Sequence, residues 1–449
     1  MFGHGHLHGG LASLLAASAP AFSPRELVDA GVLKAWLESD VGLKQTTGGA
    51  TTSTGDPLGW WQDQGADADP LLASTTARPV LRTGAYGAPV IESDASDDKL
   101  LGTVNRTFDE VLVLATPVRT PGLHGTSDPV LFDDYRGLVS LHAATTAALI
   151  AAGNAAAPQS RWIGAYATGY ERDGVNVGTS TPEAGESRAR HLYAFAQAAT
   201  YNGAPLVALT ERDSAGRRWR GTLTGIWGLR GASSEQRAKL IAWINAKYRR
   251  YVVAFDGDSL TDAYGVNDNQ SWPSLCYAAY NGCLDCPNVA TSGATLGAGG
   301  VRSLLATSGA LLDSYLALYQ RPVLVVWAGT NDIGTAAYLV NGGSAATALT
   351  NLATYIAARK AAVPGLRVIV LNLIDRTSDA AGWAVQKPIF NAGLSGVGAD
   401  VVVDVAGDAR LSNHLNATYF NADGIHLTAA GEAVVWELLQ PAIEGQLAA

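Results

Sequence analysis

The sequence has few charged residues, no basic run and few cysteines, and each shortage excludes a class of protein. Charged residues make up 16% of the 449 residues and hydrophobic residues 47%, which is typical of a globular chain rather than a disordered one. The net charge is -9 and no run rich in Lys or Arg stands out, so we expect neither nucleic acid nor an anionic membrane as a partner. No apolar stretch is long enough to cross a bilayer, so no membrane span is expected.

The three cysteines, Cys276, Cys283 and Cys286, all lie in the C-terminal half. One Cys-x-x-Cys pair without a second pair is a poor zinc site, so the sequence predicts no metal and no cofactor there. One local disulfide and three free thiols both remain open.

The chain is too long for one ordinary core, so we expect more than one domain. From residue 251 onward, strand-like and helix-like patterns alternate, which predicts a parallel sheet covered by helices on both faces. The predicted strands end near Phe255, Ala290, Trp327, Leu373 and Asp404. The predicted helices lie near 272–280, 301–318, 345–362, 387–394 and 429–443.

The first of these strands, Tyr251 to Phe255, ends at the turn Asp256-Gly257-Asp258-Ser259. Glycine permits a tight turn that few other residues can make, and a serine just after it would lie at the mouth of the sheet. Ligands bind at that edge of open α/β sheets. The turn therefore predicts either a nucleophilic serine or an ordinary helix-capping Asp or Ser.

Four short blocks follow one another in the C-terminal half: Gly257-Asp258-Ser259-Leu260, Gly293 within 288–295, Gly329-x-Asn331-Asp332, and Asp423-x-x-His426. Together they resemble the sequence blocks of the SGNH hydrolases, also called GDSL esterases and lipases, in the family's order. The resemblance covers residues 251 to about 445. It implies the three-layer α/β/α, flavodoxin-like fold of that family for residues 251–449.

The resemblance also implies a role for each block residue. Ser259 would be the nucleophile, His426 the base and then the acid, and Asp423 the group that orients His426. The backbone N–H groups of Ser259 and Gly293 and the side chain of Asn331 would form the oxyanion hole. The remaining block residues Asp258, Gly257, Gly329 and Asp332 would support the site. The alternatives are a turn-forming asparagine at 331 and a structural histidine at 426.

Before residue 250, short apolar runs alternate with turns rich in Gly, Asp, Thr and Pro, which predicts an antiparallel β-sandwich or jelly roll over residues 23–250. Helical insertions are predicted at 145–156, which is rich in alanine, and at 186–199. Residues 233–248 form a clear amphipathic helix that closes this region, capped by Ser233 or Ser234. Only Tyr248-Arg249-Arg250 joins the two halves, so we expect packed domains.

This half resembles the concanavalin A-like (laminin-G-like) jelly rolls of bacterial surface and phage proteins. The residues that carry the resemblance are 35–37, 59–63, 77–79, 97–100 and 240–248. The resemblance implies a glycan-binding or spacer domain. Trp60 and Trp61 could stack on sugars or could fill the core of the sandwich.

Residues 1–22 are mainly Gly, Ala, Ser and Leu with alternating histidines, and they predict a flexible tail or an attachment segment. The apolar run Leu11–Ala17 resembles a signal sequence, but no Lys or Arg precedes it. An attachment segment would order only against a partner, such as a particle or further copies of the chain, and its histidines could bind a metal at a symmetry axis. A flexible tail rich in His and Gly is the simpler alternative.

These patterns together predict a serine esterase that removes O-acetyl or short acyl groups from an extracellular or surface polysaccharide. Two alternatives remain: a lipase or thioesterase, and a receptor- or glycan-binding phage, virion or surface component with an accessory esterase. The polar stretch Asn267–Gln270 after the serine turn favours a hydrophilic substrate.

Overall fold

Alternate residues of strand β8 (Glu110–Pro117) face two different hydrophobic cores. Val111 and Val113 belong to a core that also contains Trp61 and Leu206 from the second N-terminal sheet. Leu112 and Leu114 belong to another core on the opposite face of the strand. This alternation is the period of two expected for a strand whose sheet is covered on both faces.

The computed structural model describes residues 22–449 except 47–48, 74–77, 95–97, 99, 104–105, 118–135, 142–149, 155–156, 163–166, 174, 177–187, 198–205, 210–219, 263, 299–300, 335–342 and 378–379. The attachment segment predicted at 1–22 lies almost entirely outside the described residues.

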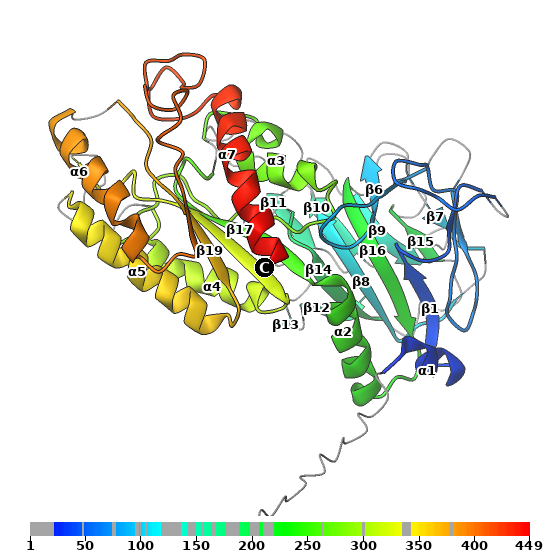
Figure 1. Ribbon diagram of the computed structural model, residues 1–449. Coiled ribbons are helices and arrows are strands. Elements are labelled where there is room, and N and C mark those ends of the chain that lie inside the picture. The colour runs from blue at the N-terminus through cyan, green and yellow to red at the C-terminus, as the bar shows by residue number, and fades with distance from the viewer. Residues whose placement is uncertain are drawn as a thin grey trace, which may run out of the picture.

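Two sheets with antiparallel pairing make up the N-terminal part of the described chain (Figure 1). The first has the order β13-β12-β14-β8-β16-β6-β5 with β1 beside β16, and its strands are β1 (Leu33–Glu38), β5 (Val80–Arg82), β6 (Val90–Asp94), β8, β12 (Ala167–Arg172), β13 (Val175–Asn176), β14 (His191–Gln197) and β16 (Arg220–Leu229). The second has the order β11-β10-β9-β15-β7-β4-β3-β2, and its strands are β2 (Leu43–Lys44), β3 (Trp60–Trp61), β4 (Leu71–Leu72), β7 (Leu100–Leu101), β9 (Arg136–Leu141), β10 (Ile150–Asn154), β11 (Ala157–Trp162) and β15 (Leu206–Ala208). The two sheets are consistent with a β-sandwich, and the jelly-roll topology stays a prediction.

Helix α2 (Ser234–Tyr248) forms where the sequence predicts it and covers the outer face of the first sheet. Ser233 caps it through a capping box with Gln236, in which each side chain bonds the other residue's backbone N–H. Leu240 and Ile244 are buried in the core that also holds Leu112 and Leu114. The short helix α1 (Pro24–Asp29) contributes Leu27 to the same core.

The predictions of helical insertions at 145–156 and 186–199 are wrong. Residues Ile150–Asn154 form β10, and His191–Gln197 form β14 between β12 and β8. Alanine favours helix locally, but backbone pairing with strands on both sides decides the conformation of these segments.

The C-terminal part contains a four-stranded parallel sheet in the order β17-β18-β19-β20. The strands are β17 (Tyr251–Gly257), β18 (Arg321–Trp327), β19 (Arg367–Leu371) and β20 (Val401–Val403). Helices lie on both faces of the sheet (Figure 1): α3 (Trp272–Ala279) packs on α7 (Ala429–Ala448), whereas α4 (Leu304–Leu316), α5 (Ala345–Ala362) and α6 (Ala380–Gly393) pack side by side. Short 3-10 turns lie at Asp268–Gln270 and Leu394–Gly396.

The strand predicted to end near Ala290 does not form as a regular strand. Its segment lies parallel to β17 and makes only isolated bridges, Val252 with Asp285 and Phe255 with Asn288. Pro287 accepts a bond from the N–H of Phe255 but has no N–H of its own to return. The segment therefore follows the edge of the sheet and leads directly into the second sequence block.

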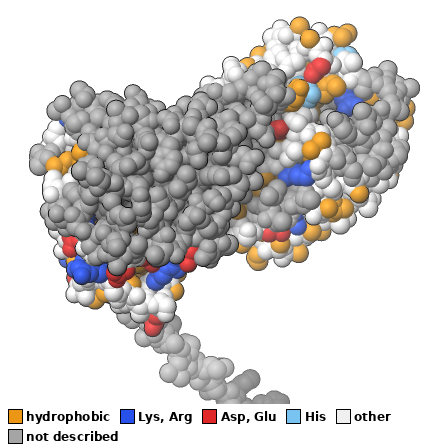
Figure 2. Space-filling model, turned by 180° about the vertical axis from the view of Figure 1, so that it is seen from behind, with side chains coloured by type: hydrophobic (Ala, Val, Ile, Leu, Met, Phe, Trp, Pro, Cys, Tyr) orange, Lys and Arg blue, Asp and Glu red, His pale blue; other side chains and the backbone are white. Residues whose placement is uncertain are grey.

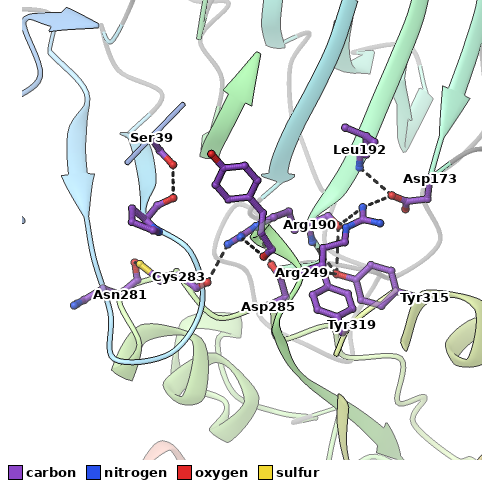
Figure 3. Close-up of polar contacts among 12 residues, drawn as sticks. Ser39, Asp173, Arg190, Leu192, Arg249, Asn281, Cys283, Asp285, Tyr315 and Tyr319 are labelled. Atoms are coloured by element: carbon purple, nitrogen blue, oxygen red, sulfur yellow. Dashed lines mark hydrogen bonds and ion pairs between the residues drawn. The ribbon is translucent and has the colours of Figure 1, made fainter. Parts of the chain in front are cut away.

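Buried ion pairs lie where the N-terminal sheets meet the C-terminal part (Figure 3). Arg190, just before β14, pairs with Asp285 at 3.4 Å and donates to the carbonyl of Cys283. Arg249, just after α2, pairs with Asp173 and also lies over the ring of Tyr319. Arg190 and Asp285 are at most 1% exposed, and Ala189 belongs to the hydrophobic core of the C-terminal part. The two parts thus share a closed interface.

In the described residues, no helix is both long enough and apolar enough to span a membrane. Seen from behind in Figure 2, basic and acidic side chains lie next to one another on the coloured part of the surface.

Candidate active site

Ser259 lies in the turn after β17, against the end of the neighbouring strand β18. The turn is held to the carbonyl oxygen of Trp327 by the N–H of Asp258 at 3.3 Å and the hydroxyl of Thr261 at 3.0 Å. Gly257 is required here, because a Cβ at this position would lie 2.1 Å from the same carbonyl oxygen. The side chain of Ser259 is therefore presented at the carboxyl edge of the sheet by backbone packing that only glycine permits.

His426 and Asp423 come from the tight turn that precedes α7. The N–H groups of Ile425 and His426 donate to one carboxylate oxygen of Asp423, which fixes the turn. The other oxygen lies 2.7 Å from His426 Nδ1, and His426 Nε2 lies 2.8 Å from Ser259 Oγ. These distances fit an imidazole that donates from Nδ1 to the carboxylate and accepts at Nε2 from the serine hydroxyl.

The charge of Asp423 is stabilised where it is needed. Partial burial alone would raise its pKa, but the bonds from the His426 ring and from the two N–H groups lower the pKa below its ordinary value. The carboxylate is therefore ionised at neutral pH and can support a positive charge on His426.

The second and third blocks meet beside Ser259's turn. Asn331 donates from Nδ2 to the carbonyl of Ala294 at 2.9 Å, next to Gly293, which has φ +77. Both carboxylate oxygens of Asp332 accept from the N–H of Leu296 at 3.0 Å, so the two loops are tied together. A Cβ at Gly329 would lie 2.8 Å from the ring of Phe390, so this position too has no space for a side chain. The structure thus brings Gly293 and Asn331 together, and their role as oxyanion donors stays a prediction.

Asp258 lies beneath this site rather than in it. It is fully buried, and burial raises its pKa to about 7, while the N–H of Leu260 and the charge of Arg376 oppose the shift and Asp332 adds to it. Arg376 itself donates to the carbonyl of Thr330, the residue before Asn331. Asp258 therefore stabilises the turn without contacting the reacting groups.

Sequence reasoning missed several residues that hold these loops. Asp262 accepts from both the N–H and the hydroxyl of Ser292, next to Gly293. Asp375 lies 2.7 Å from His414 Nδ1. Two residues further on, the N–H of Thr377 donates to the carbonyl of Gly424, which lies in the turn that carries Asp423 and His426. Asp262, Asp375 and Thr377 all lie outside the four sequence blocks. A polar residue shortly after a catalytic turn or strand end was the signal that could have suggested Asp262 and Asp375.

The tryptophans predicted as sugar contacts differ from each other. Trp61 is fully buried and donates its indole N–H to the carbonyl of Glu38, so its ring cannot stack on a sugar. Trp60 is half-buried, with Lys44 Nζ 4.8 Å from its ring centroid. The core alternative therefore holds for Trp61.

Among the described residues, no group of three or more His, Cys, Asp or Glu side chains could hold a metal. All three cysteines are buried and free, and the sulfur atoms of Cys276 and Cys286 are 3.7 Å apart.

A parallel α/β sheet with a serine, a histidine and a carboxylate at its carboxyl edge is the arrangement of an α/β-type hydrolase. Residues 255–434 match the GDSL-like lipase/acylhydrolase family, and this part of the chain is a domain of that family.

Three solved structures illustrate the comparison with known folds. A psychrotrophic esterase, EstA, from Pseudoalteromonas sp. is 18% identical, with 44% of this chain and 99% of that chain covered and a TM-score of 0.35. A family 2 carbohydrate esterase with a carbohydrate binding domain, from Corynascus thermopiles (Myceliophthora fergusii), is 14% identical, with 81% and 95% covered and a TM-score of 0.35. A family 3 carbohydrate esterase from Talaromyces cellulolyticus is 16% identical, with 44% and 98% covered and a TM-score of 0.33. At TM-scores this low the likenesses support no conclusion about this chain. A search of curated proteins found no match.

Proposed function

We propose that the protein is a serine esterase that hydrolyses O-acetyl or other short acyl esters on an extracellular or particle-surface polysaccharide. The observation that carries the esterase proposal is the continuous chain of bonds from Ser259 Oγ through His426 to Asp423, at 2.8 and 2.7 Å. Ser259 attacks the ester carbonyl carbon while its proton moves to His426 Nε2. The oxyanion is held by the N–H groups of Ser259 and Gly293 and by Asn331 Nδ2.

His426 then gives the proton to the leaving alcohol, and an acyl group remains on Ser259. Water attacks this acyl-enzyme, His426 accepts the proton from the water, and the acid is released as Ser259 regains its hydrogen. Asp423 stays ionised throughout and holds Nδ1, so no metal or cofactor takes part in the proposed steps.

The exposed polar residues that follow the serine turn in the sequence support a hydrophilic substrate. Asn267, Asn269 and Gln270 follow the serine turn and are exposed. The N-terminal sheets are joined to the hydrolase domain through a closed interface, which suits an accessory module that holds a polymer or a particle in a fixed orientation.

One observation favours a second candidate, a lipase or thioesterase. Val301 is 66% exposed, and its N–H donates to the carbonyl of Gly293 at 3.1 Å. An apolar side chain beside a predicted oxyanion donor could contact a longer acyl chain.

The test uses the full chain. Acetate release from acetylated capsular and cell-wall polysaccharides is measured together with hydrolysis of p-nitrophenyl esters of increasing acyl length. The proposal expects acetate release and a preference for acetyl over octanoyl esters, with Ser259→Ala as the inactive control. A preference for octanoyl esters would favour the lipase or thioesterase, and unchanged activity in Ser259→Ala would refute the serine mechanism.

A further inference from the structure

The ring of Tyr264 lies against the imidazole of His426. The ring centroids are 4.6 Å apart and the planes are tilted by 40°, so the two faces overlap in part. Asp423 bonds Nδ1 of the same imidazole and Ser259 bonds Nε2. The edges of His426 are thus held by hydrogen bonds, and one face is covered by an aromatic ring.

Tyr264 is also fixed to the residue that carries the nucleophile. Its backbone N–H donates to the carbonyl of Ser259 at 3.0 Å. The position of the Tyr264 ring is therefore set by the same turn that sets the position of Ser259, so the two move together.

The next residue connects this turn to the turn of the base. A Cβ at Gly265, which has φ +92, would lie 2.8 Å from Asn421 Nδ2. The N–H of Asn421 donates to the carbonyl of His426 at 2.8 Å, and its side chain donates to the carbonyl of Leu427 at 2.9 Å. The serine turn therefore contacts the segment that carries His426 at two places: the ring of Tyr264 lies on the His426 ring, and the backbone of Gly265 lies close to the side chain of Asn421.

We propose that Tyr264 is a positioning residue that holds the His426 ring in line with Ser259 and supports the positive charge that the ring acquires during turnover. The inference rests on the proposed esterase function and adds a residue to it. Two hydrogen bonds define an axis through the imidazole, but rotation about that axis is limited only by contacts on the faces. The face of an aromatic ring also attracts a cation, and this attraction arises only when His426 has taken the proton from Ser259.

Four variants of the full chain test the proposal. Tyr264→Phe and Tyr264→Trp keep an aromatic face, whereas Tyr264→Leu and Tyr264→Gln remove it. A cation–aromatic contact at a half-buried position contributes a modest energy. The kcat for p-nitrophenyl acetate should therefore fall about tenfold in Tyr264→Leu and Tyr264→Gln. KM should change little, because the contact strengthens in the transition state. The Phe and Trp variants should keep kcat within about twofold.

The pH profile supplies a readout that loss of packing alone would not move. In Tyr264→Leu the acid limb of the kcat/KM profile should shift to lower pH, because the imidazolium loses a stabilising neighbour while Asp423 and Ser259 remain. Thermal unfolding of all variants checks that they are folded. If Tyr264→Leu does not fold, Tyr264→Gln replaces it in the kinetic measurements.

The outcomes separate the inference from the function on which it rests. If Ser259→Ala is active, the esterase proposal fails. If Ser259→Ala is inactive but the folded Leu and Gln variants keep wild-type kcat and the wild-type pH profile, Tyr264 has no positioning role. An equal loss in Tyr264→Phe would overturn the inference as well, because it would assign the effect to the hydroxyl group.

Discussion

The active-site edge of the sheet and the interface between the two parts of the molecule both depend on charged side chains, but they hold them differently. Asp423 is 43% exposed and His426 15%, whereas Arg190 and Asp285 are at most 1% exposed. In the proposed mechanism the charge on His426 appears and disappears in each turnover, which requires a site that can stabilise both states. The charged groups at the interface take no part in the proposed mechanism, and each arginine lies beside an aspartate.

Asp173 and Asp285 show how the interface holds its charges. Burial would raise the pKa of Asp173, but Arg249 and His191 outweigh burial and hold its pKa well below the ordinary range. For Asp285 burial dominates and raises the pKa, although Arg190 opposes it. Asp285 is therefore the interface carboxylate that depends most on its partner, and the N-terminal part supplies that partner.

The comparison implies that activity and stability respond to different residues. A fragment that begins near Arg249 would lose both Arg190 and Asp173, so Asp285 and Arg249 would each lose an oppositely charged partner, and the surface that the N-terminal part covers would be exposed. Tests of the N-terminal part therefore need the full chain, with single substitutions on each side of the comparison.

The largest effect is expected from Ser259→Ala. Loss of the nucleophile should lower kcat/KM for p-nitrophenyl acetate by about 10⁴-fold or more, because a catalytic serine and its base act as one unit. The free energy of unfolding should change by less than about 0.5 kcal/mol, since the substitution removes one small hydroxyl. Urea unfolding and initial-rate kinetics on the same preparation check both values. A variant that unfolds easily would show that the site and the fold are not separable.

Arg190→Met should lower the stability of the protein and leave its catalytic activity unchanged. It leaves Asp285 buried without its cationic partner, so the free energy of unfolding should fall by about 3–5 kcal/mol. Activity per folded molecule should be kept at low temperature, because Arg190 makes no contact with the catalytic residues in the described structure. Arg25→Met removes an ion pair with Asp29 in which the side chains are 63% and 67% exposed, and it is the matched control, with little change expected. Equal stability of the two variants would contradict the role given to the interface.

Asn331→Ala tests the active-site side with a smaller effect. Loss of one oxyanion donor should lower kcat by about 10²–10³-fold with little change in KM. The variant also loses the bond to the carbonyl of Ala294, so circular dichroism and thermal unfolding must accompany the kinetics. An effect confined to KM would mean that Asn331 binds the substrate equally well in the ground state and the transition state.

The parts of the molecule that depend on local sequence were predictable. The capping box of Ser233 and Gln236 and the exact bounds of α5 (Ala345–Ala362) follow from residues close in the chain. The turn at Gly257 to Ser259 and the turn at Asp423 to His426 are also local, and each was recognised from its own block. That Ser259 and His426 meet follows from the sheet topology, which the family resemblance implied.

The parts that depend on distant neighbours were not predictable. The pattern of 186–199 suggests a helix, yet β14 lies between two strands that the local sequence does not reveal. The ion pair between Arg190 and Asp285 joins residues 95 positions apart, and no pattern marks either residue. The sequence predicted no role for Tyr264, because the contact with His426 exists only when the two turns meet.

Among the described residues, the buried carboxyl group of Glu432 differs from the interface carboxylates, because no basic side chain opposes the rise of its pKa. Glu432, in the first turn of α7, accepts from the N–H of Trp272 at 3.0 Å, at the start of α3. Burial raises its pKa from 4.5 to about 8, and the bond from Trp272 only partly opposes the shift. Unlike the interface carboxylates, Glu432 is therefore kept neutral rather than paired.

The sign of the expected pH dependence follows from proton binding. Between the unfolded pKa of 4.5 and the folded pKa of about 8, the folded protein holds a proton that the unfolded chain has released, so stability falls as the pH rises through this window. Glu432→Gln keeps a carbonyl oxygen for Trp272 but cannot ionise. The variant should be close to the wild type near pH 5 and exceed it at pH 9 by about 3–5 kcal/mol in the free energy of unfolding. Asp258 titrates in an overlapping range in both proteins, so the difference between the two urea-unfolding curves isolates Glu432. Parallel stability profiles from pH 5 to pH 9 would mean that Glu432 is not the neutral buried acid that its surroundings indicate.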